Sequence, residues 1–303
     1  YTAGLGGMAH GGLGYRLPVG NDGLALGADF STSHYQLGQD FASLDASGGS
    51  DTQALSASYP LVRSPAFNLN AHLAHDWRKL VDRVESIGTV VDKASRTLTL
   101  VVAGDIGQVG PGQGFSAFSI GYAHGELDLQ SPAALTIDKQ GAGTAGRFGK
   151  WNVNLLHLQP LGDRLMLRLA LALQKADKNL DSSEKFTLGG AHGVSAYAQG
   201  EASGDSGYLA TLELQYARAA DPGPGRIEPF MFLDIGAVAI NARPFTAGDN
   251  RRALAAGGAG LQWMPASGVE VAMMVATRLD HQQKEPWQPA SQTRGWIQII
   301  RHF

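Results

Sequence analysis

Apolar and polar residues alternate along almost the whole chain of 303 residues, and this alternation predicts β-strands. In the clearest run, RLMLRLALALQ, leucines occupy every second position from Leu165 to Leu173, while Arg168 and Gln174 fall on the other face. A strand separates these two sets of side chains, whereas a helix would mix them. Because Arg168 and Gln174 would be costly to bury in a dry core, we expect them to face water and the leucines to face lipid.

The same pattern recurs often enough to predict about 14 strands, or about 22 residues for each strand with its connection, as in a transmembrane β-barrel. The other runs are GGLGYRLP, GLALGADFS, ALSASYPL, FNLNAHLAHDW, RTLTLVVAG, FSAFSIGYAHG, KWNVNLLHL, a short KFTLGG, YLATLELQY, PFMFLDIGAVAI, LAAGGAGLQW, VEVAMMVATRL and GWIQIIRHF.

The connections between these runs alternate in length. The short ones, PVGNDG, RSPA, PLGD and PASG, are rich in residues that form tight turns. The long ones, LGQDFASLDASGGSD, DKNLDSSE and EPWQPASQT, are polar. Short turns at one end and long loops at the other are typical of an outer-membrane barrel.

Composition supports this interpretation. Charged residues make up 17% of the chain, below the usual share of about 25%, although apolar residues reach only 44%. No apolar run is long enough for a membrane-spanning helix, so an apolar surface spread over alternating positions accounts better for the low charge. The net charge of −3 argues against a nucleic-acid partner, and the lack of cysteine excludes disulfides and thiolate metal sites. We expect neither a cofactor nor a metal ion.

One long segment breaks the alternation: FTLGGAHGVSAYAQGEASGDSGY, from Phe186 to Tyr208, is glycine-rich and has no regular period. A strand pattern, YLATLELQY, resumes directly at its end. Further on, PFMFLDIGAVAI places Phe232, Asp234 and Gly236 on one face of a strand whose other face is apolar. If that apolar face meets lipid, Asp234 points into the lumen.

These two segments together resemble the outer-membrane transporters of two-partner secretion, the haemolysin secretion/activation protein family. GYRLPVGNDGLALGADFSTSHYQLG, LSASYPLVRS, SPAALTIDKQGAGTAGRFGKWNVNLLHLQPLGDRL and KNLDSSEKFTLGG are similar to its barrel as well, so the resemblance covers essentially the whole chain. It implies an all-β fold, a transmembrane antiparallel β-barrel that has sixteen strands in the family, and no enzymatic activity.

The resemblance also implies a role for each motif. The glycine-rich segment corresponds to a sixth extracellular loop folded back into the lumen, and F-x-D-x-G is a strand motif that faces it. In the family an Arg at the loop tip pairs with the strand Asp, but this chain has Ser195 at that position. We therefore expect Asp234 to be solvated or to have another cation as its partner, with a looser loop, a weaker fold or a damaged motif. The loop motif comprises Gly189, Gly190, Gly193, Val194, Ser195, Ala196, Tyr197, Gly200, Glu201, Gly204 and Asp205, and the strand motif comprises Phe232, Asp234 and Gly236.

The resemblance further implies one domain over residues 1–303, the C-terminal part of a longer protein. Five strands follow the loop, as in the family, but only about nine precede it where eleven are expected. The polypeptide-transport-associated (POTRA) domains and a plug helix are also missing from the sequence, so we expect a truncated N-terminus. Phe303, which ends an alternating strand, resembles the C-terminal signal that barrels present to their assembly machinery.

The expected function is an integral pore of the bacterial outer membrane that moves a large partner exoprotein, unfolded in transit, from the periplasm to the cell surface. Two alternatives remain: an assembly factor of the same superfamily that acts on other barrels, and a passive porin. A soluble β-sandwich would require the leucine faces to pair with each other.

Five other features favour ordinary structural roles. No glycine-rich segment has the strand–loop–helix context of a phosphate-binding loop. His72 and His75 would lie on opposite faces of a strand, and Asp280 with His281 has no nucleophile near it. Glu201 and Asp205 belong to the loop motif, where we expect a structural role rather than catalysis. We expect Arg251 and Arg252 to be solvated rim residues.

Overall fold

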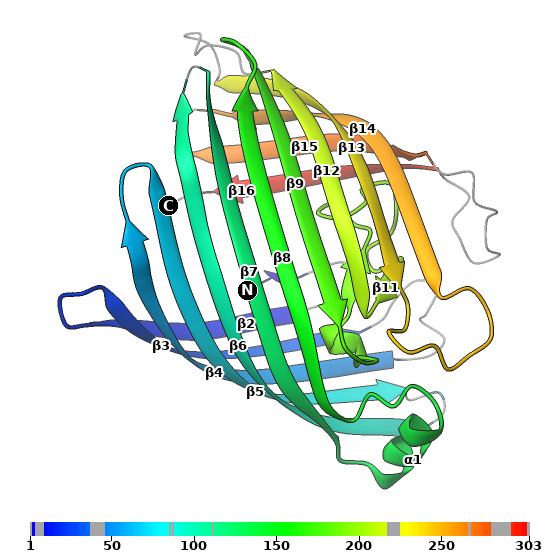
Figure 1. The fold of residues 1–303 in the computed structure, drawn as a ribbon. Coiled ribbons are helices and arrows are strands. Elements are labelled where there is room, and N and C mark those ends of the chain that lie inside the picture. The colour runs from blue at the N-terminus through cyan, green and yellow to red at the C-terminus, as the bar shows by residue number, and fades with distance from the viewer. Residues whose placement is uncertain are drawn as a thin grey trace.

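The chain forms a strongly curved antiparallel sheet of 14 strands with a loop inside the curve (Figure 1). The total agrees with the prediction of about 14, but the sheet includes a short first strand that was not predicted and leaves out the predicted run KFTLGG. The computed structural model describes residues 2–3, 9–36, 46–84, 86, 88–110, 112–216, 225–265, 268–279 and 292–301. The strands are β1 (Thr2–Ala3), β2 (Ala9–Val19), β3 (Leu24–Gln36), β4 (Ala46–Arg63), β5 (Phe67–Val84), β6 (Thr89–Gly110), β7 (Gln113–Leu129), β8 (Gly146–Pro160), β9 (Leu165–Ala176), β12 (Ser206–Tyr216), β13 (Arg226–Ala239), β14 (Arg251–Met264), β15 (Val269–Arg278) and β16 (Thr293–Arg301).

The sheet has an up-and-down topology. Each strand pairs with the next one along the chain, and β9 pairs with β12 across the long loop. Five strands follow that loop, as the sequence predicted. The strand order begins at β1 and ends at β16, and within the described ranges no pairing joins these two edges.

Four short elements lie outside this sheet among the described residues, and one of them corrects a prediction. The run KFTLGG forms β10 (Phe186–Leu188), which pairs only with β11 (Ala202–Gly204) and is therefore a hairpin inside the loop rather than a barrel strand. A 3₁₀ turn, η3 (Ser182–Glu184), lies just before it. The helix α1 (Pro132–Gln140), in the connection between β7 and β8, was not predicted.

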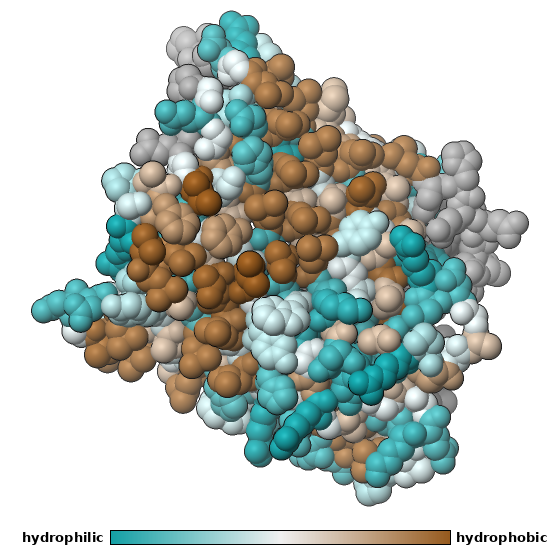
Figure 2. All heavy atoms as spheres, viewed as in Figure 1, coloured by the Kyte–Doolittle hydropathy of each residue, from teal (hydrophilic) through white to brown (hydrophobic). Residues whose placement is uncertain are grey.

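The predicted division of faces is confirmed. In β9, Leu165, Leu169 and Leu173 are exposed on the outer face, as expected. Gln174 lies on the inner face, but it is buried rather than exposed to water, because its side-chain amide donates to the carbonyl oxygens of Glu184 and Asp205. In β13 the outward Met231, Leu233 and Ile235 are likewise exposed. Figure 2 shows apolar surface across the face of β7–β9, with hydrophilic residues gathered toward the end that carries α1. Such exposed apolar area suits a lipid environment.

The two ends of the barrel differ as expected. At one end, called the short-turn end, the connections 20–23, 64–66 and 161–164 are tight. The opposite end, called the long-loop end, carries α1, the loop 177–205 and the connection 240–250. Parts of two predicted long loops, in residues 37–45 and 280–291, lie outside the described residues. No helix among the described residues is both long and apolar enough to cross a membrane.

Candidate functional site: a loop docked on the inner wall

The loop 177–205, called the inner loop, returns from the long-loop end into the space enclosed by the sheet (Figure 1). Its hairpin, β10 with β11, pairs Phe186 with Gly204 and Leu188 with Ala202. Residues 189–201 form the tip. The tip begins with Gly189 and Gly190, whose φ angles of 93° and 89° favour glycine and turn the chain sharply.

The centre of the tip binds the strand acid directly. The backbone N–H and the hydroxyl of Ser195 both donate to Oδ2 of Asp234, at 3.1 and 2.6 Å, and Thr211 Oγ1 donates to Oδ1 at 2.8 Å. Asp234 is only 2% exposed, so these three donors replace the water that a carboxylate otherwise needs. We expected water or another cation to satisfy Asp234; instead Ser195, together with Thr211, supplies the hydrogen bonds.

Two side chains that the sequence analysis did not single out fix the tip from the last strands. Trp296 of β16 donates its indole N–H to the carbonyl oxygen of Ser195 at 2.8 Å. The guanidinium of Arg278 of β15 lies 4.3 Å from the ring centroid of Tyr197, within the range of a cation–π interaction. Alternation places Arg278 and Trp296 on the inner faces of their strands, but nothing local connects them to the loop.

The other two residues of the strand motif make room for the loop and pack against it. A Cβ atom on Gly236 would lie 2.8 Å from Cδ2 of Leu188, so glycine is what allows β10 to approach β13. Phe232 is 8% exposed and belongs to the apolar cluster beneath the loop. A Cβ atom on Gly258 would lie 2.5 Å from Cζ of Phe232, so glycine on the neighbouring strand leaves space for this ring.

This apolar cluster joins the inner loop to the inner wall of β13, β14 and β15. Close-packed apolar contact of this kind stabilises a loop without directional bonds. Its buried members are Leu188, Val194, Ala196, Tyr197, Ala202, Phe232, Val238, Leu254, Ala256 and Ala276.

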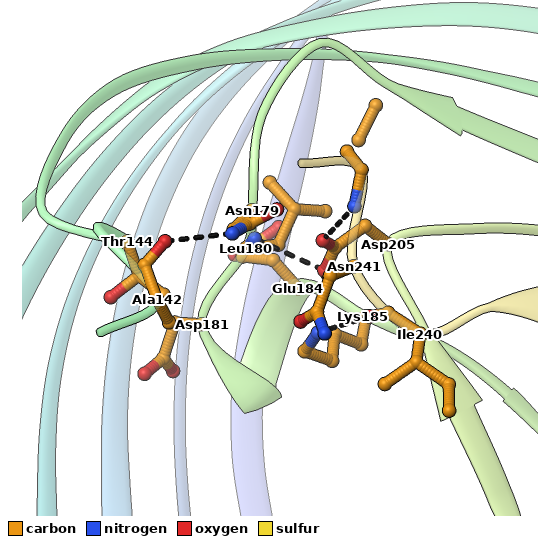
Figure 3. Close-up of polar contacts among 12 residues, drawn as sticks. Ala142, Thr144, Asn179, Leu180, Asp181, Glu184, Lys185, Asp205, Ile240 and Asn241 are labelled. Carbon is orange, nitrogen blue, oxygen red and sulfur yellow. Dashed lines mark hydrogen bonds and ion pairs between the residues drawn. The ribbon is translucent and has the colours of Figure 1, made fainter. Parts of the chain in front are cut away.

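The foot of the inner loop is organised around Asp205, which is fully buried (Figure 3). Its carboxylate accepts hydrogen bonds from Lys185 Nζ at 2.6 Å, from the backbone N–H of Leu180 at 3.1 Å and from that of Ala242 at 2.7 Å. Asp205 therefore joins the two legs of the inner loop to the connection after β13. Buried acids are tolerated when they are paired and hydrogen-bonded in this way.

The turn before β10 reaches the opposite wall through ion pairs. Glu184 contacts Arg78 Nη1 of β5 at 2.7 Å and Lys150 Nζ of β8 at 2.9 Å. Asp181 contacts Lys93 Nζ of β6 at 2.8 Å. Burial alone would raise the pKa of Asp181, but the hydrogen bond and charge of Lys93 and the N–H of Ser183 outweigh it and hold the pKa below its ordinary value.

A cavity of about 810 Å³ lies beside the loop tip, between the inner faces of β7–β9 and the last strands. Arg168 Nη1 and Glu213 Oε2 lie 4.0 Å apart across β9 and β12. Polar residues from several strands line this cavity, so part of the lumen beside the docked loop is not filled by side chains. The polar side chains that line it are Ser119, Asn154, Arg168, His192, Ser195, Thr211, Glu213, Asp234 and Gln298.

The remaining candidates are not brought together into a catalytic site. Glu201 pairs with Arg252 Nη2 at 3.6 Å, which corrects the expectation that Arg252 is a solvated rim residue. Arg251 is exposed, as expected. Within the described ranges no cluster of three or more potential metal ligands occurs.

Two further candidates are separated or cannot be placed. His72 lies on the inner face of β5, whereas His75 lies on the outer face against Trp77, with ring centroids 4.2 Å apart. Asp280, His281 and the terminal Phe303 fall outside the described residues.

A curved antiparallel sheet with an apolar outer face and a loop docked within it defines a transmembrane β-barrel protein. The family model of the haemolysin secretion/activation proteins ShlB/FhaC/HecB matches residues 7–263. The chain therefore belongs to this family.

Individual relatives agree with this assignment. The heme/hemopexin transporter protein HuxB of Haemophilus influenzae is 26% identical over 271 residues, which is 89% of this chain and 47% of HuxB. The chain thus spans about half the length of the curated relatives it matches. These relatives are named as transporters rather than as enzymes.

Solved structures share the fold. CdiB from Escherichia coli superimposes with a TM-score of 0.77 at 17% identity, over 98% of this chain and 53% of CdiB. BamA from Haemophilus ducreyi, crystallised without its POTRA domains 1–3, gives a TM-score of 0.61 at 15% identity, over 96% of this chain and 62% of that one. Both likenesses concern the barrel fold alone.

Proposed function

We propose that this chain is the barrel of an outer-membrane transporter that moves a large partner exoprotein from the periplasm to the cell surface. Membership of the haemolysin secretion/activation family supports this function. The observation that carries it is the inner loop, whose tip is held to Asp234 inside the barrel by two hydrogen bonds from Ser195. A passive pore needs no such buried attachment, whereas a transporter that must stay closed to solutes does.

The loop and strand motifs have a structural role in this proposal. Ser195, Asp234 and Gly236 set the position of the inner loop, and the loop in turn determines how much of the lumen is open. The cargo passes as an unfolded chain, and its folding outside the cell provides the driving force. Outer-membrane lipid surrounds the apolar outer face, and the barrel assembly machinery inserts the protein through its C-terminal strand.

One observation favours a second candidate, an assembly factor for other barrels: the fold similarity to BamA. The family match favours export over assembly, because it covers residues 7–263 with a model of secretion proteins. The name of HuxB refers to haem and haemopexin, but for this chain we propose only the class of cargo, a large secreted polypeptide.

The test is to express the protein from its complete gene, together with the large exoprotein encoded beside it, in a Gram-negative host. Surface exoprotein is then measured by antibody labelling of intact cells. We expect export, and we expect at least a tenfold loss when the loop tip 189–201 is replaced by a short glycine–serine linker. The matched control shortens the exposed connection 244–249, which should leave export unchanged.

Normal barrel insertion without any exported exoprotein would contradict the proposal. If the levels of other outer-membrane proteins then fell in cells lacking the gene, the assembly-factor function would replace it.

A further inference from the structure

We infer that the outer face of β2–β6 binds one lipid of the outer leaflet, in a groove that places a phosphate at one end and an acyl chain at the other. The lipid whose chemistry fits is lipid A, a phosphorylated glucosamine lipid with several acyl chains. The site rests on the outer-membrane location that belongs to the proposed function, but it takes no part in moving the exoprotein.

An open groove of about 1010 Å³, called the outer groove, follows the outer face of β2–β6, the blue to cyan strands of Figure 1. Two outward-facing alanines line it, Ala28 of β3 and Ala94 of β6. Their small side chains leave space between larger neighbours such as Phe30 and Trp77. The outer face of the barrel is therefore hollowed here enough to receive part of a lipid molecule.

The outer groove changes in polarity along the strands. Strand register places Trp77 of β5 opposite Arg96 of β6, and Lys79 lies two residues farther toward the long-loop end. Leu55 of β4 and Tyr15 of β2 line the groove on the side toward the short-turn end. The charged end thus faces the long loops, and the apolar end faces the middle of the membrane.

This direction decides which leaflet supplies the lipid. Long loops are extracellular in an outer-membrane barrel, so the charged end of the outer groove lies at the level of the outer-leaflet headgroups. In Gram-negative bacteria lipid A is the main lipid of that leaflet, and its phosphates lie at the membrane surface above its acyl chains. The polarity of the groove therefore matches the orientation of lipid A.

The two cations at the charged end are available to a ligand. Lys79 and Arg96 are both exposed. Asp51 lies opposite Lys79 and Glu126 opposite Arg96, yet among the described residues neither cation forms a hydrogen bond or an ion pair. A phosphate can therefore bind without displacing a protein partner, with the guanidinium as a two-pronged donor and the ammonium as a point charge.

Charge alone does not explain the site, because Asp51 and Glu126 offset the two cations nearby. The apolar end alone does not explain it either, since lipid tails are as apolar as leucine and gain little by exchanging one neighbour for another. Trp77 lies between the two ends, and its ring packs edge-on against His75 with centroids 4.2 Å apart. Tryptophan favours this boundary between headgroups and acyl chains. Cations, tryptophan and groove shape together select a phosphorylated lipid.

The test measures lipid bound to the purified complete protein in mild detergent, by native mass spectrometry after incubation with lipid A. One variant, Lys79→Gln with Arg96→Gln, removes both cations of the outer groove. A second, Ala28→Trp, fills the groove and keeps its charges; Ala28 is exposed, so the larger side chain displaces no core residue. The matched control, Lys175→Gln with Arg147→Gln, removes one exposed lysine and one exposed arginine from the outer faces of β9 and β8, outside the groove.

We expect the wild type and the control to retain one lipid A, and each groove variant to show at least fivefold lower occupancy with a normal heat-induced shift of the folded barrel on gels. Dephosphorylated lipid A should bind the wild type equally weakly. Equal occupancy in the wild type and both groove variants, or an equal loss in the control, would overturn the site. Stronger retention of phosphatidylglycerol than of lipid A would overturn the choice of lipid. Because the measurement needs no exoprotein, it decides the lipid site even if the protein exports nothing and the proposed function fails.

Discussion

At the scale of single residues, Asp234 shows how a motif tolerates a change at its partner position. The family resemblance implies an Arg at the loop tip, yet Ser195 with its backbone N–H and hydroxyl places two donors on the same carboxylate oxygen. Arg278 provides a cation nearby, but its guanidinium lies over the ring of Tyr197, and the acidic residue of the tip, Glu201, pairs with Arg252. Gly236 and Gly258 contribute through the space they leave for Leu188 and Phe232.

Ser195→Ala tests this arrangement. The substitution removes the 2.6 Å hydroxyl contact and leaves a buried carboxylate short of one donor, which typically costs about 1–3 kcal/mol. We expect faster protease cleavage in residues 189–201 and a lower temperature for heat-induced unfolding of the barrel on gels. Ser56→Ala, on the inner face of β4 away from the inner loop, is the control and should match the wild type. Equal protease resistance of both variants would contradict a docking role for the Ser195 hydroxyl.

At the scale of elements, the alternation of apolar and polar residues is a local property of the sequence. It could therefore predict which segments form strands and which of their side chains point outward or into the lumen. The leucine face of β9 and the inward position of Asp234 are examples. KFTLGG was wrongly counted as a barrel strand, because a run of three strand residues carries no information about its partner. The helix α1 had signals that could have found it: Ser131 as N-cap, Pro132 in the first turn and Gly141 as C-cap.

The contacts of the inner loop could not be predicted in the same way. Trp296 reaches Ser195 across 101 residues of sequence, and Arg78 reaches Glu184 across 106. Only the folded barrel brings these residues together, so local patterns in the sequence do not indicate which of them are in contact. The extra length of β6, 22 residues, was also missed, because its polar end extends beyond the apolar alternation.

The ion pairs of the turn 181–184, which hold the inner loop to β5, β6 and β8, should respond to acid. Since the pKa of Asp181 in the folded protein is below its ordinary value of 3.8, its ion pair adds stability above about pH 4, and this stability is lost as the pH falls through the lowered pKa. We expect open-channel events in planar bilayers to increase severalfold between pH 6 and pH 3. Asp181→Asn should already show a high frequency of open-channel events at pH 6, and this frequency should change little between pH 6 and pH 3.

Asp76→Asn, which removes an inner-face acid of β5 outside the inner loop, is the control for this pH dependence and should retain the increase in open-channel events between pH 6 and pH 3. If open-channel events in Asp181→Asn increased between pH 6 and pH 3 as much as in the wild type, the pH dependence would come from other carboxylates in the lumen.

At the scale of the whole molecule, the barrel has two inner walls of different character. The wall of β12–β16 holds the loop tip through an apolar cluster and Asp234, whereas the wall of β5–β8 holds the turn 181–184 through ion pairs. The inner loop therefore crosses the lumen and is attached on both sides. Outside, apolar side chains such as Leu169, Leu233 and Ile297 are exposed to the surroundings and match lipid.

The most direct test of the central claim, that a polypeptide passes through this lumen, uses two adjacent residues of β8. Asn154 faces the cavity inside and Val153 faces outward, so a photo-reactive amino acid at either position samples one side of the same strand. In cells in which the exoprotein is arrested in transit by a fused, stably folded domain, we predict strong cross-linking to it from position 154 and none from position 153. Equal cross-linking from both positions, or none from position 154 while export proceeds, would contradict passage through the barrel.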